Sequence, residues 1–294
     1  MNKKTDALYR LPAFLKSFLG LSLALLLCAG CSSRIVKVSD MSEVKMPELV
    51  DKMRQADMVF VGELHTNKWH HQVQLNVIKA LNEAGVPLSI GMEMFTTENQ
   101  DKLDKWVSGE MDINEFIRFY YVSWRLPWPN YRDILIYARE NKIPVIGLNV
   151  SRKIIHQVFT KGYSSLTPEQ MAELPPGIEC KVDAEYEEFI KEAMEDHDAS
   201  PEGFKKFCEA QMVWDNAMAY NAIEYLKENP GKKMVVIAGS GHSWRRGIPA
   251  QVSRLSGYSS VVILPEAHYR LNLESITAKD TDYLWVGSLM DSMN

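Results

Sequence analysis

Two glutamates and two histidines stand in glycine-containing motifs at the ends of apolar runs: Glu63, His65, Glu93 and His242. Glu63 and His65 are two residues apart, so in extended backbone both side chains project to the same side. Two imidazoles with two carboxylates can bind a divalent transition metal and leave a position open for water or substrate. Alternatively, one histidine acts as a general base that a carboxylate orients, while the other polarises the substrate. The residue types alone leave both chemistries open.

The elements that must position these residues are short apolar runs, each ended by a turn-forming or polar residue. Such runs, rich in Val, Ile and Met, predict strands that are buried on both faces. In open α/β sheets the carboxyl ends of parallel strands meet at one edge, where ligands bind. A parallel sheet would therefore bring the four residues into one site. The predicted strands are Met58–Gly62, Leu88–Met94, Pro144–Asn149 and Lys233–Gly239.

Helical periodicity separates these runs and sets the fold class. Apolar residues recur with a 3.6-residue period in 72–84, 131–141 and 204–227. Strands that alternate with helices are typical of a parallel sheet with right-handed crossovers. We therefore predict an α/β fold with a parallel-sheet core and flanking helices. Two stretches too long for connections, Met111–Pro129 and Ser164–Ser200, are predicted to be helical insertions that form a lid.

Two adjacent histidines, His70 and His71, begin the first of these helices. Only one of two neighbouring helical residues can face the site. Gln74 lies four residues after His70, so these two side chains would share a helix face. Either histidine is a candidate for ligand contact.

The composition argues against nucleic acid as a partner. The chain has 294 residues, of which 24% are charged and 46% hydrophobic, which is ordinary globular usage. The formal net charge is −5, so no basic excess indicates binding to DNA or RNA.

The first thirty residues are typical of a bacterial lipoprotein signal. Basic residues precede an apolar run of about ten residues, whereas a membrane-spanning helix needs about 20. Ala29 and Gly30 before Cys31 resemble a lipobox, in which the cysteine is acylated, with palmitate among its acyl chains, and becomes the new N-terminus. We expect a signal peptide over 1–30, a tether over 31–48 and a single domain over 49–294. Ser32 fits outer-membrane sorting, with the domain facing the periplasm or the cell surface.

The mature chain would keep two cysteines in an oxidising compartment, where a disulfide can persist. Cys180 and Cys208 could form one, or both could be isolated buried thiols. Their spacing does not decide between the two. Neither lies in a CxxC arrangement, which argues against a thiolate zinc site.

With these motifs in place, the chain resembles the ChaN family of haem-binding bacterial lipoproteins, in the Tiki superfamily, which is related to the erythromycin esterases. The resemblance covers about residues 50–265. It rests on an ordered set of motifs: the blocks at 59–65 and 91–95, Gln100, Trp128, Tyr131, Ala138, the block 147–149, Gln211, Trp214-Asp215, Met218-Ala219, and the blocks 238–242 and 247–249.

The resemblance implies non-covalent haem binding linked to iron or haem uptake at the outer membrane, with a TonB-dependent receptor as a candidate partner. Haem needs an axial ligand, an apolar slot and a partner for its propionates. Because a single small lid can hardly cover a porphyrin, a homodimer is expected. The chain has no CxxCH motif, which excludes covalent c-type attachment. The candidate haem-binding residues are Tyr131, His65, His70, His242 and Trp128, with Tyr121 as a further phenolate, Trp124, Met92 and Met94 as walls, and Arg125 or Arg132 for the propionates.

The same superfamily contains hydrolases, so the resemblance leaves open whether the protein is an enzyme. The alternative function is a metal-dependent or histidine-based hydrolase of the Tiki or erythromycin esterase type, a peptidase or an esterase. In that case Glu63, His65, Glu93 and His242 would be catalytic residues or metal ligands.

Overall fold

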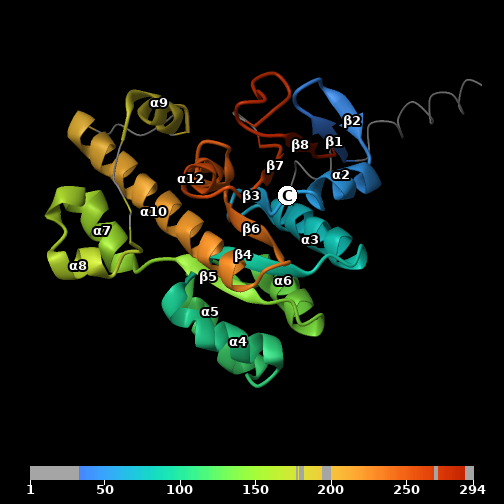
Figure 1. Ribbon diagram of the computed structural model, residues 1–294, viewed down its shortest axis with the longest axis horizontal. Helices are drawn as coiled ribbons and strands as arrows, with labels where there is room; N and C mark the ends of the chain where they lie inside the picture. Colours follow the sequence, from blue (N-terminus) through green and yellow to red (C-terminus); the bar gives the residue numbers. More distant parts are fainter. Residues whose placement is uncertain (1–32, 177, 179–181, 194–199, 268–270, 289–294) are drawn as a thin grey trace, which may run out of the picture.

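The computed structural model describes residues 33–176, 178, 182–193, 200–267 and 271–288. These residues form an eight-stranded sheet in the order β2-β1-β8-β7-β3-β6-β4-β5, with helices packed around it (Figure 1). Six strands run parallel, and β1 and β2 are antiparallel to their neighbours. The strands are β1 Arg34–Lys37, β2 Ser42–Val44, β3 Met58–Glu63, β4 Leu88–Thr96, β5 Val145–Asn149, β6 Lys233–Gly239, β7 Ser260–Pro265 and β8 Tyr283–Val286.

The predicted α/β class is confirmed, and all four predicted strands are present as β3, β4, β5 and β6. Their side chains are buried on both faces because the sheet lies between two apolar cores. Val59 and Val61 of β3 belong to one core, whereas Met58 and Phe60 belong to the other. This alternation explains why a central strand is apolar at successive positions.

The three helical periodicities are also confirmed, as α3, α6 and α10. Asn67 caps the first of them, because its side chain accepts hydrogen bonds from the backbone N–H groups of Trp69 and His70. The helices are α2 Met46–Met53, α3 Lys68–Glu83, α4 Gln100–Ser108, α5 Ile113–Ser123, α6 Trp128–Glu140, α7 Arg152–Lys161, α8 Pro168–Ala172, α9 Ala184–Ala193, α10 Pro201–Glu228, α11 Ser240–Ser243 and α12 Ile248–Leu255.

The aromatic insertion over 111–129 contributes α5 and the start of α6, and most of its rings pack in the core. Phe116 stacks on Trp106 with ring centroids 4.0 Å apart, and Phe119 stacks on Phe95 at 5.6 Å. Trp128, a candidate wall of a haem slot, is buried against the rings of Trp106 and Phe116. Its position therefore serves the core rather than an open cavity.

The expected tether over 31–48 differs from the structure, because much of this segment belongs to the sheet. β1 pairs with β2 on one side and with β8 on the other. Ile35, Val36, Val38 and Val44 are buried. The burial of these few apolar side chains outweighs the mixed polarity that suggested a tether.

The outer edge of β5 is covered by side chains instead of a further strand. The Gln100 side chain donates to the carbonyl of Val145 at 2.8 Å and accepts from the N–H of Gly147 at 3.1 Å. Asn221 of α10 donates to the carbonyl of Leu148 at 2.7 Å. These amides satisfy backbone groups that an edge strand would otherwise expose.

Predictions about the N-terminal signal and the cysteines fall mostly outside the described residues. Residues 1–30, Cys31 and Cys180 are not among them. Cys208 is buried and has no disulfide partner within the described part of the chain. In that part, no helix is long and apolar enough to cross a membrane.

Candidate functional site

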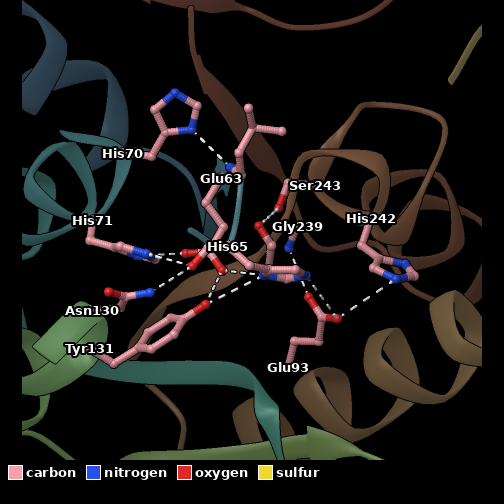
Figure 2. Close-up of polar contacts among 12 residues, drawn as sticks. Glu63, His65, His70, His71, Glu93, Asn130, Tyr131, Gly239, His242 and Ser243 are labelled. Carbon is pink, nitrogen blue, oxygen red and sulfur yellow. Dashed lines mark hydrogen bonds and ion pairs between the residues drawn. The ribbon is translucent and has the colours of Figure 1, made fainter. Parts of the chain in front are cut away.

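The four residues singled out in the sequence converge at the carboxyl edge of the sheet (Figure 2). Glu63 ends β3 and His65 follows it, Glu93 lies in β4, and His242 lies in the short helix α11 after β6. Because β3, β4 and β6 are adjacent and parallel, their carboxyl ends bring these side chains together.

Glu63 is buried and accepts hydrogen bonds from two groups through one oxygen. Its Oε1 lies 2.6 Å from Nδ1 of His65 and also accepts a hydrogen bond from the hydroxyl of Tyr131. Burial alone would raise the pKa of Glu63, but its contacts with His65 and His71 lower it to about 2. Glu63 is therefore a fixed negative charge beneath the site.

His65 carries a positive charge at neutral pH. Burial acts to lower its pKa, but the carboxylates of Glu93 and Glu63 raise it to about 9. With Nδ1 held by Glu63, Nε2 lies toward Glu93, 3.9 Å from Oε1. The side chain is 34% exposed, so part of the ring lies open to solvent beside the site.

His71 and His70 have different surroundings. Nδ1 of His71 lies 2.9 Å from Oε2 of Glu63, and its Nε2 donates to the carbonyl of His65 at 3.1 Å. Both ring nitrogens face acceptors, which requires the doubly protonated ring. The pKa of His71 is accordingly raised: burial opposes the charge, and the contact with Glu63 favours it.

His70 points away from the other histidines (Figure 2). Its Nδ1 accepts from the N–H of Leu64 at 2.8 Å, and its Nε2 lies 3.0 Å from the carbonyl of Glu266. Burial lowers the pKa of His70 to about 4, so the ring is neutral. Both nitrogens are used within the protein, which indicates a structural role.

Tyr131, a candidate phenolate ligand, is fully buried. Its hydroxyl donates to Glu63, and burial together with the charge of Glu63 raises the pKa of Tyr131 well above its ordinary range. The hydroxyl therefore remains protonated and orients Glu63.

A second histidine–carboxylate pair lies across the site. Nδ1 of His242 is 2.6 Å from Oδ1 of Asp215, whose Oδ2 accepts a hydrogen bond from the hydroxyl of Tyr186 at 3.0 Å. Burial opposes the charge on His242, but Glu93 and Asp215 raise its pKa. Asp215 and Tyr186 are site residues that the sequence analysis missed as such. The available signal was a lone carboxylate on a largely apolar face of α10, where Met212, Val213 and Met218 are also buried.

Glu93 lies between the two histidines. Its Oε1 is 3.9 Å from Nε2 of His65 and 3.8 Å from Nε2 of His242. Its Oε2 accepts the backbone N–H of Gly239 at 2.7 Å. Each histidine thus has Nδ1 fixed by a buried carboxylate and Nε2 directed toward the same central carboxylate.

This arrangement can do three things chemically. A histidine whose Nδ1 donates to a carboxylate presents an oriented Nε2, as metal-ligating histidines commonly do. The same pairing supports general acid–base catalysis. It can also supply an axial ligand to haem iron. Within the described residues, no group of three or more His, Cys, Asp or Glu side chains has a geometry that could hold a metal ion.

A small pocket of about 150 Å³ opens beside Glu93. Its lining includes Val122, Trp124 and Arg152. Trp124 meets the ring of His65 edge-on with centroids 5.2 Å apart, and the guanidinium of Arg152 lies 5.6 Å from the Trp124 ring. Val122 is 82% exposed. The mouth of the site therefore combines an apolar surface with a positive charge.

Fold and site together define an α/β protein with two carboxylate-paired histidines at the carboxyl edge of its sheet. Residues 49–252 match the family described as "Haem-binding uptake, Tiki superfamily, ChaN". This match spans most of the chain, which therefore belongs to this family.

Solved structures resemble the fold over nearly its whole length. A structure described as "Cofacial heme binding to ChaN of Campylobacter jejuni" superposes with a TM-score of 0.68 at 20% identity, covering 86% of this chain and 96% of that one. The type III effector HopBA1 superposes with a TM-score of 0.50 at 15% identity, covering 88% and 98% respectively.

One curated relative is Protein RETICULATA-RELATED 5, chloroplastic, of Arabidopsis thaliana. It is 22% identical over 254 residues, which are 80% of this chain and 34% of the relative. The chain thus spans about a third of the length of this relative.

Proposed function

We propose that this protein binds haem non-covalently at the carboxyl edge of the sheet, with Nε2 of His65 as the axial ligand. The observation that carries the proposal is an imidazole, about a third exposed, whose Nδ1 is fixed by the buried carboxylate of Glu63. Such a partner orients an iron-ligating ring and raises its basicity. The cationic ring would have to release its Nε2 proton to solvent before Nε2 could hold iron. Membership of the family supports haem as the ligand.

The surroundings of His65 fit a porphyrin that lies on the surface rather than in a closed cavity. The pocket of about 150 Å³ is too small to enclose one, because ligand cavities typically measure about 300–1,000 Å³. Val122 and Trp124 offer an apolar surface, and Arg152 offers a charge for a propionate. Nε1 of Trp124 is buried in the free protein and has no hydrogen-bond partner among the described residues.

The proposal extends to anchoring and assembly. Acylation of Cys31 would attach the domain to the outer membrane, facing the periplasm or the cell surface, where it would take part in iron or haem uptake with a TonB-dependent receptor. A porphyrin on an open surface leaves one face in water. A second copy of the chain would cover that face, which is the reason for proposing a homodimer.

The test is a titration of the lipid-free protein with hemin. We expect a saturable shift of the Soret band for the wild type and at least about tenfold weaker binding for His65→Ala, because an axial ligand is lost. The matched control is His156→Ala on the exposed side of α7, which should bind as the wild type does. A free-hemin spectrum at all ratios, or equal binding by wild type and His65→Ala, would refute the proposal.

Hydrolysis of an ester or peptide is the second candidate function. The pairs Glu63–His65 and Asp215–His242, with Nδ1 to oxygen distances of 2.6 Å, favour it because each carboxylate orients an imidazole that can act as a general acid. The test is turnover of a panel of esters and peptides. A rate about 10²-fold lower in Glu63→Gln would support hydrolysis, since general acid–base groups typically contribute that much. Unchanged turnover in Glu63→Gln would exclude it.

A further inference from the structure

The strand that begins the described fold starts at the same edge of the sheet as the site. β1 is antiparallel to β8, so its first residues lie at the carboxyl end of the parallel strands. Ile35 pairs with Trp285 of β8, which pairs with Pro265 at the end of β7. The register of β7 with β3 places Pro265 level with Glu63.

β1 and β3 are also close laterally. In the sheet order, β8 and β7 lie between them, which makes three strand spacings. At about 4.8 Å per spacing, the first residues of β1 lie about 14 Å from the end of β3. The chain therefore enters the sheet next to the site and not at the opposite end of the strands.

The length of chain between the lipidation site and the sheet is very short. Cys31 precedes Arg34, the first residue of β1, by three residues. Fully extended, three residues span about 10 Å. If Cys31 is acylated, as the proposed function holds, the first residue of β1 lies within about 10 Å of the membrane surface. The carboxyl edge of the sheet is then close to the membrane where β1 begins.

Exposed apolar side chains surround the site on this edge. Leu64, which directly follows Glu63, is 47% exposed, and Val122 is 82% exposed beside the pocket that reaches Glu93. Apolar side chains that contact the boundary between headgroups and acyl chains add to the affinity of a lipid anchor.

We propose that in the haem-free single copy, before a second copy covers the site, the carboxyl edge of the sheet faces the bilayer that holds the acylated Cys31, with Leu64 and Val122 in contact with lipid. The mouth of the site then opens toward the membrane surface. A ligand that partitions into the interface, such as an amphipathic porphyrin, would reach His65 without crossing bulk water. This inference depends on the lipid anchor of the proposed function and not on haem binding.

The test is photo-crosslinking of the full acylated chain in vesicles of phosphatidylethanolamine and phosphatidylglycerol. Benzoylphenylalanine replaces Leu64 in one variant and Val122 in a second. The matched control carries it at Gln55, which is exposed at the opposite end of β3. We expect lipid adducts several-fold more abundant at 64 and 122 than at 55, and none of this excess in a Cys31→Ala chain.

Equal adducts at all three positions, or an excess at 55, would overturn the orientation. In parallel, mass spectrometry of the mature chain measures whether it carries acyl groups. A chain without acyl groups would overturn both the anchor and the orientation. Hemin titration of the lipid-free protein tests haem binding separately, so the two proposals fail by different measurements.

Discussion

The ring of His65 lies directly against Gly239, and this contact explains why a glycine is required there. A Cβ built on Gly239 would lie 3.2 Å from Cε1 and 3.3 Å from Nε2 of His65. Any larger residue would push the ring away from its place between Glu63 and Glu93. The glycine thus sets the position of the proposed iron ligand.

Gly239→Ala should therefore weaken hemin binding several-fold, because the ring must move by a few tenths of an ångström. We expect a loss of stability of about 1 kcal/mol from the tighter packing. Gly241→Ala is the matched control in the same motif, since a Cβ there meets nothing within 4 Å. Hemin titration and urea unfolding of both variants check the prediction, and equal hemin affinities would contradict it.

His70 predicts how stability depends on pH. Its pKa is about 4 in the folded protein and about 6.5 when unfolded, so between these values only the unfolded chain binds the proton. The free energy of unfolding should fall by about 2 kcal/mol from pH 7.5 to pH 5 through this residue.

Urea unfolding at both pH values tests this, with His70→Asn as the comparison. The variant should be less stable overall but should lack this part of the decrease. His65, His71 and His242 have raised pKa values, so their stabilisation is complete below pH 6.5 and is lost only as the pH rises above it. An equal decrease in variant and wild type would show that His70 is not the cause.

At the scale of elements, a hydrogen bond of Tyr186 connects the inserted helix α9 to the site. Tyr186 of α9 donates to Asp215 of α10, and Asp215 holds His242. Both Tyr186 and Asp215 are buried. Helix α9 thus contributes to the site by orienting a carboxylate through Tyr186.

Tyr186→Phe should cost about 2 kcal/mol in the free energy of unfolding, because a hydrogen bond to a buried carboxylate is lost. The control is Tyr137→Phe, whose hydroxyl accepts a hydrogen bond from Asn82 and which is only partly buried. Its loss should cost about 1 kcal/mol or less. Urea unfolding of both variants measures the difference, and equal losses would argue against the role of Tyr186.

The sequence predicted the central strands well because they are bounded, uniformly apolar runs. It did not predict β1, β2, β7 or β8. β1 and β2 are three or four residues long with mixed polarity, and only their pairing partners make them strands. That pairing is a tertiary property, which periodicity within a short window does not contain.

At the scale of the whole molecule, the predicted site could be assembled from the sequence because parallel strands bring their carboxyl ends together. Glu63, His65, Glu93 and His242 needed only that rule. That rule does not predict Asp215, because this residue lies in the middle of the long helix α10 and not at the end of a strand. Tyr186 comes from an insertion whose placement depends on tertiary contacts, among them its hydrogen bond to Asp215.

The covered outer edge of β5 limits how copies of the protein can associate. Since Gln100 and Asn221 already occupy its outward backbone groups, a second chain cannot extend the sheet there without displacing them. Edge-to-edge aggregation through β5 is thereby disfavoured. Copies of the protein that meet along the outer edge of β5 can therefore separate again, because no new strand pairing holds them together.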